Sequence, residues 1–246
     1  NKGEVTSGSM VVTYGQPYGT LPTPTLTGHT FEGWYTEMDG GKQITESTSV
    51  QITTDQTLYA RWRANVYKIT YVCNLSGVSN SNPATYTYGN AVTLRNLTKT
   101  GYTFGGWYTT EDCAGDAVTE ISVTETGNKT FYAKWTANTY TVTFDANKGE
   151  VTSGSMVVTY GQPYGTLPTP TRANYTFLGW FTTATSSAKI EAATTMTRTE
   201  DHTLYAQWAA NDTNLWVGGT KVTVAASGDV FRDGTVSYNP GTRTLT

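Results

Sequence analysis

The chain has few charged residues and no long apolar run. Lys, Arg, Asp and Glu make up 14% of the 246 residues, and the formal net charge is -3. Such a chain has no basic field for a nucleic-acid backbone and no polybasic patch for a membrane surface. No apolar stretch approaches the roughly 20 residues that a membrane-spanning helix needs. We therefore predict neither a nucleic-acid partner nor direct membrane insertion.

The residues that catalysis and metal binding require are also sparse. His29 and His202 are the only histidines, and the acidic residues are scattered through predicted turns. A hydrolase needs paired carboxylates, a nucleophile with a base, or a set of metal ligands. The spacing Asp145-x-Asn147-x-Gly149 matches part of a calcium loop, but the missing carboxylates favour a polar hairpin turn. We predict no catalytic residue, no metal site and no cofactor, and we do not expect an enzyme.

What the chain does contain is an internal repeat. Residues 1–25 recur letter for letter as residues 147–171, an offset of 146. A drifted copy lies between them, because the Gly-Trp pairs at Trp34, Trp107 and Trp180 step by 73 residues. A period of this length allows one small domain per repeat, each with its own core. The frame predicts three repeats and a tail, with the boundaries 1–64, 65–137, 138–210 and 211–246.

The hydrophobic pattern within a repeat predicts strands. In 139–144 polar and apolar residues alternate, as in a half-buried strand, and 156–160 follows as the returning strand of a hairpin. The prolines and glycines of 162–171 predict a loop across the sheet. Two further strands are expected at 174–182 and 203–208. No stretch shows ten residues of helical periodicity, so little helix is expected.

The joints between repeats are short, and the tail differs from the repeats. Ala-Asn recurs at 64–65, 137–138 and 210–211, with about three residues between neighbouring strands. Linkers this short do not act as flexible tethers, so a semi-rigid array is predicted. Residues 211–246 predict two hairpins, around Gly218-Gly219 and around 239–241, which belong to a different β module.

With this frame in view, the repeat resembles the Listeria–Bacteroides repeat, the B repeat of internalin-type surface proteins. The resemblance covers about 85% of the chain and is carried by Tyr140–Gly149, Tyr160-Gly161, Leu167-Pro168, Tyr175–Trp180 and Leu204–Trp208. It implies a mainly β fold, α+β at most, of tandem β-grasp-like repeats. It also implies display on, or secretion from, bacterial cells and a role in adhesion, partner binding or spacing. The resemblance supplies no catalytic residue and no settled ligand.

Aromatic residues are the candidate binding residues. Six of the seven tryptophans are one repeated pair, which core packing explains in domains with few Leu and Ile. Strict alternation along 174–182 would nevertheless place Trp180 on the face opposite Phe177, and an exposed Trp beside Tyr205 could bind a sugar ring or a partner side chain. The candidates are the equivalent residues of the three repeats: Trp34, Tyr59, Trp107, Tyr132, Trp180 and Tyr205.

These observations predict an extracellular, non-catalytic repeat region of a bacterial surface protein, located at the cell surface or secreted. It would act in adhesion or partner binding and as a semi-rigid spacer, with a host or matrix protein or a glycan as partner. The alternative is a set of carbohydrate-binding accessory modules of a surface enzyme. The chain begins and ends inside modules, so a longer parent protein is expected.

Two structural details are also predicted. Cys73 and Cys113 stand where the third repeat has Ala146 and Ser186, and the ends of their strands should point to opposite poles of the sheet, too far apart for a disulfide. Because Asn1 matches Asn147, the first repeat lacks its opening strand. Another segment should then fill that slot, or residues 1–64 should be less ordered.

Overall fold

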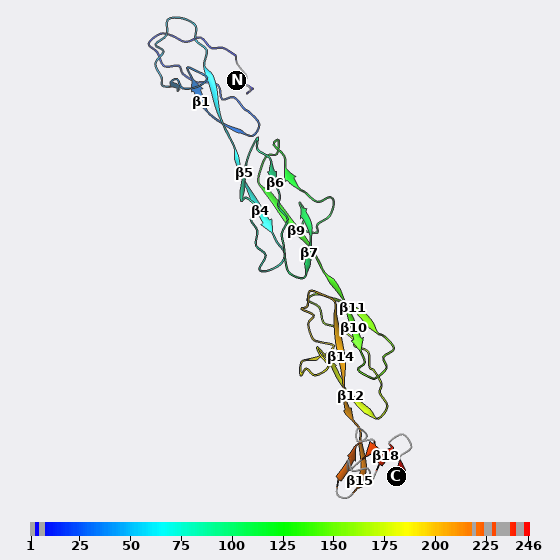
Figure 1. Ribbon diagram of the computed structural model, residues 1–246. Helices are drawn as coiled ribbons and strands as arrows, with labels where there is room; N and C mark the ends of the chain where they lie inside the picture. The colour runs from blue at the N-terminus through cyan, green and yellow to red at the C-terminus, as the bar shows by residue number, and fades with distance from the viewer. Residues whose placement is uncertain (1–2, 5–7, 218–219, 224–227, 230–236, 240–243) are drawn as a thin grey trace. The chain divides into compact units, whose positions relative to one another are not determined.

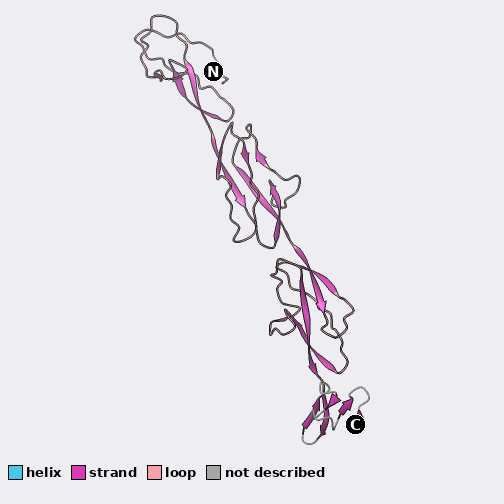
Figure 2. Cartoon of the chain, viewed as in Figure 1, coloured by secondary structure: helices cyan, strands magenta, loops and turns pink. Residues whose placement is uncertain are grey.

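The structure is a computed structural model that describes residues 3–4, 8–217, 220–223, 228–229, 237–239 and 244–246 (Figure 1). The described residues form strands and loops without a helix, and 41% of the chain is strand (Figure 2). They accordingly include no helix long and apolar enough to cross a membrane. The chain is mainly β, as predicted. It divides into two compact units, residues 1–98 with 104–135 and residues 99–103 with 136–246.

The third repeat is one five-stranded sheet with the order β11-β10-β14-β12-β13. The opening strand β10 forms an antiparallel hairpin with β11 and runs parallel to the last strand β14, which also pairs antiparallel with β12. The four predicted strands of this repeat are all present, and 162–171 is a loop. The strands are β10 Thr139–Asp145, β11 Ser155–Thr159, β12 Tyr175–Phe181, β13 Lys189–Ile190 and β14 His202–Ala210.

The core of this repeat lies on one face of the sheet, under the proline-containing loop. It follows from the alternating pattern, since apolar residues two apart in a strand share a face. Polar residues between them, such as Thr143, face solvent. The buried core residues are Val142, Phe144, Val158, Tyr164, Trp180, Met196, Leu204 and Ala206.

A β-bulge interrupts β12, and this corrects one prediction. The register with β14 shifts between Phe177 and Gly179, so Leu178 is an extra residue and is 47% exposed. Phe177 and Trp180 therefore lie on the same face, with their ring centroids 5.5 Å apart. Strict alternation was wrong here because a bulge sets two residues of one strand against one of its neighbour. The same shift occurs in the first repeat between Phe31 and Gly33.

The middle repeat has the same plan with a shorter hairpin. Its main sheet has the order β5-β4-β9-β7, with β4 parallel to β9, and β6 pairs with β8 separately. Its core contains Ile69, Trp107 and Phe131, at the positions of Val142, Trp180 and Leu204. The strands are β4 Val66–Val72, β5 Thr85–Thr87, β6 Val92–Thr93, β7 Tyr102–Tyr108, β8 Glu120–Ile121 and β9 Lys129–Ala137.

The first repeat contains three strands, in the order β2-β1-β3. They are β1 His29–Tyr35, β2 Gln43–Ile44 and β3 Tyr59–Ala64. Within the described ranges no strand pairs with the other edge of β3. The opening strand is thus missing, as predicted, and the buried core is reduced to Tyr18, Ile44 and Val50.

The tail contains the two predicted hairpins. β15 (Asp212–Val217) pairs antiparallel with β16 (Thr220–Thr223), and β18 (Ser237–Asn239) pairs with both β17 (Gly228–Asp229) and β19 (Thr244–Leu245). The turn residues predicted at 218–219 and 240–241 lie outside the described residues.

The cysteines Cys73 and Cys113 are both free, as predicted from the strand directions. Burial raises the pKa of the Cys73 thiol above its usual value.

Candidate functional sites

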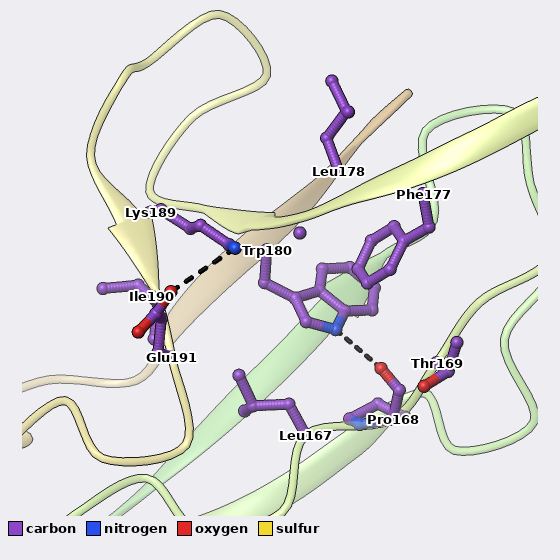
Figure 3. Close-up of a pocket in the computed structure, with 10 residues that line it drawn as sticks. Leu167, Pro168, Thr169, Phe177, Leu178, Trp180, Lys189, Ile190 and Glu191 are labelled. Carbon is purple, nitrogen blue, oxygen red and sulfur yellow. Dashed lines mark hydrogen bonds and ion pairs between the residues drawn. The ribbon is translucent and has the colours of Figure 1, made fainter. Parts of the chain in front are cut away.

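The central tryptophan of each repeat anchors the proline-containing loop to the sheet. The Trp180 indole N–H donates a hydrogen bond to the carbonyl of Pro168 at 2.7 Å (Figure 3). Trp34 binds Pro22 at 2.7 Å and Trp107 binds Arg95 at 2.9 Å in the same way. Trp107 and Trp180 are only 1% and 2% exposed, while Trp34 is half-buried.

The structure does not bring the candidate Trp and Tyr together on one face. Trp180 lies opposite Ala206 across the sheet, whereas Tyr205 lies opposite Phe181. Neighbouring residues of a strand point to opposite faces, so Trp180 packs in the core and the half-buried Tyr205 lies on the outer face. Tyr59 and Tyr132 occupy the equivalent half-buried positions. As binding residues, the six aromatic residues remain a prediction.

The outer face beside these tyrosines differs among the repeats in its charge. In the first repeat Arg61 lies over the ring of Tyr35, 3.8 Å from its centroid, and in the second Lys134 lies 5.1 Å from that of Tyr108. The third repeat has Gln207, whose side-chain amide donates to the carbonyl of Ser186 at 2.7 Å. The surface around the exposed part of each tyrosine is therefore cationic in two repeats and neutral in the third.

A solvent-open groove of about 390 Å³ lies along the bulge of β12. Figure 3 shows Leu167, Pro168 and Phe177 around the Trp180 ring, with Leu178 pointing away from it. An ion pair between Lys189 and Glu191, with the N and O atoms 3.4 Å apart, stands on its other side. The groove offers apolar contact and one charge pair, but no catalytic set. Nor do the described residues hold a cluster of three or more His, Cys, Asp or Glu that could bind a metal ion.

Asn147, part of the candidate calcium loop, has a structural role. Its backbone N–H donates to the carboxylate of Asp145 at 2.8 Å, and its side chain donates to the carbonyl of Ala206 at 3.1 Å. Asn74 makes the second bond, to Ala133, in the middle repeat. Both asparagines have a positive φ, 46° for Asn147 and 60° for Asn74, which asparagine tolerates better than most residues. These bonds tie the turn after the opening strand to the last strand.

Each joint is organised by one asparagine. The Asn138 backbone N–H donates to the carbonyl of Gly101 at 2.9 Å, and its side-chain oxygen accepts the Thr103 hydroxyl at 2.6 Å. Its own carbonyl accepts the backbone N–H of Tyr160 at 2.9 Å, and its side-chain amide donates to the Tyr140 hydroxyl at 3.4 Å. Asn138 thus binds residues of the repeat before it and of the repeat after it.

The same bonds recur at the other joints. The first joint has all four, and the third has the two bonds to the preceding repeat. The sequence analysis recognised the joints only by their length. Their signal in the sequence is that the bonding residues repeat at a period of 73, in the sets Gly28, Thr30, Asn65, Tyr67 and Tyr88 and Asn174, Thr176 and Asn211.

Ring packing supplements these bonds. His29 meets Tyr88 edge-on with centroids 5.2 Å apart, and Tyr102 meets Tyr160 in the same way at 5.6 Å. Gly101 has a φ of 77°, and a Cβ at this position would lie 2.2 Å from the Tyr160 ring. Both the backbone angle and the ring therefore require glycine.

Comparison with known proteins places the repeats in a family and among surface-type proteins. A family model described as the Listeria-Bacteroides repeat domain matches residues 1–61, 67–134 and 140–207. Each range lies inside one predicted repeat; the exact boundaries stay a prediction.

Three relatives show which longer proteins contain similar sequence. A Gly-rich membrane protein of Evansella cellulosilytica is 35% identical over 191 residues, 75% of this chain and 21% of that protein. A second membrane protein of this organism is 32% identical over 157 residues, 63% of this chain and 23% of its own length. Internalin H of Listeria monocytogenes is 39% identical over 117 residues, 47% of this chain and 20% of the internalin. The chain spans between a fifth and a quarter of these relatives.

Proposed function

Because this chain belongs to the Listeria-Bacteroides repeat family, we propose that it is a non-catalytic, extracellular repeat region of a bacterial surface protein that spaces and presents neighbouring domains. A surface location is supported by relatives that include an internalin and two membrane proteins. The sheet order of the third repeat, with its first and last strands parallel at the centre, also supports a β-grasp-like module without the usual helix.

The observation that carries the spacing role is the asparagine at each joint. One residue that hydrogen-bonds to the repeats on both sides resists bending at that point, and the bonds are alike from joint to joint. A stiff spacer holds a terminal domain away from the cell without the entropic cost of ordering a flexible tether.

Small-angle scattering tests this role. The wild-type chain should scatter as an extended particle, and the double variant Asn65→Ala/Asn138→Ala should give a broader distribution of dimensions. Asn90→Ala, in an exposed turn, is the matched control and should scatter like the wild type. A compact wild-type particle, or variants that scatter alike, would remove the spacing role.

Adhesion to a host or matrix protein is the second part of the proposal. The half-buried tyrosines Tyr59, Tyr132 and Tyr205 form a repeated outer-face feature, and tyrosine and arginine are common anchors of protein interfaces. A carbohydrate-binding role is less well supported, because burial of Trp107 and Trp180 removes the ring surfaces on which a sugar would stack. A screen against matrix proteins and a glycan array, each with Tyr132→Ala as a control, separates the two.

A further inference from the structure

The outer edge of β3 in the first repeat differs from the equivalent edge in the other two. There the last strand is flanked on both sides, β9 by β4 and β7, and β14 by β10 and β12. β3 pairs with β1, but no strand of the described chain covers its other edge. A strand edge of this kind presents unpaired backbone donors and acceptors.

The indole of Trp62 marks what this edge lacks. The equivalent residues Trp135 and Trp208 donate to the carbonyls of Cys73 at 2.8 Å and Ala146 at 3.0 Å. Each acceptor follows its opening strand directly. The indole nitrogen of Trp62 is buried and finds no acceptor in the described part of the chain. A buried donor without a partner loses its hydration with nothing in return.

Apolar side chains beside the edge also lack their cover. In the third repeat the opening strand contributes Val142, which is fully buried, and Phe144, whose ring centroid lies 4.7 Å from that of Trp180. In the middle repeat Tyr71 packs against Trp107 at 5.0 Å. Their counterparts in the first repeat, Leu58 and Trp34, are only half-buried.

The segment that should form the other wall of the slot is exposed. Residues 10–13 have the same sequence as residues 156–159 of β11, which pair with β10. In the first repeat Val11 is 99% exposed, against 67% for Val157, and Val12 is half-buried where Val158 is buried. One inserted strand would contact this segment on one side and β3 on the other.

We propose that the edge of β3 is an acceptor site for a β-strand supplied by a separate polypeptide. The strand runs parallel to β3 and has an aliphatic residue, an aromatic residue two positions later, and a carbonyl two positions beyond that. These are the features of Val142, Phe144 and Ala146. In the register of β10 against β14, its aromatic residue lies opposite Leu58 and its final carbonyl accepts the Trp62 indole. Backbone hydrogen bonds give such strand addition its affinity, and the alternating pockets give it specificity.

The test uses the full chain with ¹⁵N-labelled tryptophan and a synthetic peptide with the sequence of residues 138–147. The peptide should shift the indole resonance of Trp62 in a saturable manner and leave those of Trp135 and Trp208 in place. A peptide with lysine at the positions of Val142 and Phe144 should not bind, whereas lysine at the positions of Thr141 and Thr143, which face outward, should be tolerated.

A spin label on the peptide determines its direction. A label at the C-terminus should broaden the Trp62 indole resonance, and one at the N-terminus should not. The proposal is overturned if the Trp62 resonance does not move, if a scrambled peptide moves it equally, or if the N-terminal label broadens it. A shift that depends on protein concentration without peptide would identify a second copy of the chain as the occupant, and would also overturn it.

Discussion

At the residue scale, glycine and asparagine hold the joints for steric reasons that can be separated by paired substitutions. Gly101 has a φ of 77° and faces the Tyr160 ring, while Gly165 has a φ of 79° and open space around its Cα. Alanine at either site pays the left-handed strain, about 1–2 kcal/mol. Gly101→Ala must also displace the ring.

We therefore expect Gly101→Ala to lose more unfolding free energy than Gly165→Ala and to abolish the edge-on packing of Tyr102 on Tyr160. Urea unfolding and the ring resonances of Tyr160 measure the two effects. Equal losses in the two variants would show that the ring imposes no constraint.

The tryptophans of the last strands offer a second comparison. Trp208→Phe leaves the Ala146 carbonyl without its indole donor, which should destabilise the third repeat by about 1–3 kcal/mol beyond the loss of ring volume. Trp62→Phe removes the same volume but breaks no hydrogen bond within the described residues. Unfolding followed by NMR signals of each repeat should show the larger loss for Trp208→Phe. A larger loss for Trp62→Phe would contradict this.

Tyr71 gives the middle repeat a dependence on alkaline pH. Burial raises its pKa from 10.0 to about 12, and its hydroxyl donates to the carbonyl of Pro83. The unfolded chain ionises first, so this contribution to stability is complete below pH 10 and is lost as the pH rises toward 12. Tyr71→Phe should flatten the fall in unfolding free energy over that range. An unchanged slope in the variant would rule out Tyr71 as its source.

At the element scale, the bulge in β12 decides which side chains reach the core. Leu178 is the extra residue, and the positions before the central glycine in the other repeats, Glu32 and Gly105, are also exposed. Without the extra residue, either Phe177 or Trp180 would point to solvent, because a one-residue slip reverses the faces of a strand.

Deleting Leu178 should therefore unfold the third repeat, since Trp180 would leave the core. Leu178→Ser should change the unfolding free energy by less than about 0.5 kcal/mol, because the side chain is on the surface. Circular dichroism and the indole resonance of Trp180 distinguish the two variants. A deletion variant that folds with Trp180 buried would show that the bulge is dispensable.

At the scale of the whole molecule, the same sequence occupies two environments. Residues 10–13 and 156–159 have equal intrinsic rates of amide exchange because their sequences are identical, but only the second set pairs with an opening strand. Amide exchange followed by NMR should show much less protection at 10–13. Equal protection would mean that the first repeat closes this segment without a partner strand.

Much of the architecture follows from the sequence alone. The 73-residue period determined the number of repeats, and the alternation of Thr139–Phe144 determined a strand with Val142 and Phe144 inward. These are local patterns, since period and alternation are properties of the chain itself. Family resemblance added the kind of protein, and the free cysteines followed from strand direction.

Only the tertiary structure decided the rest. The bulge at Leu178 depends on how β12 pairs with β14, and the burial of Trp180 depends on that bulge. Asn138 acts at a joint because folding brings Gly101 and Tyr160 to it from 37 residues before and 22 residues after. The identical residues 10–13 and 156–159 differ in structure because a strand forms through hydrogen bonds to a neighbour, and only one of the two segments has that neighbour.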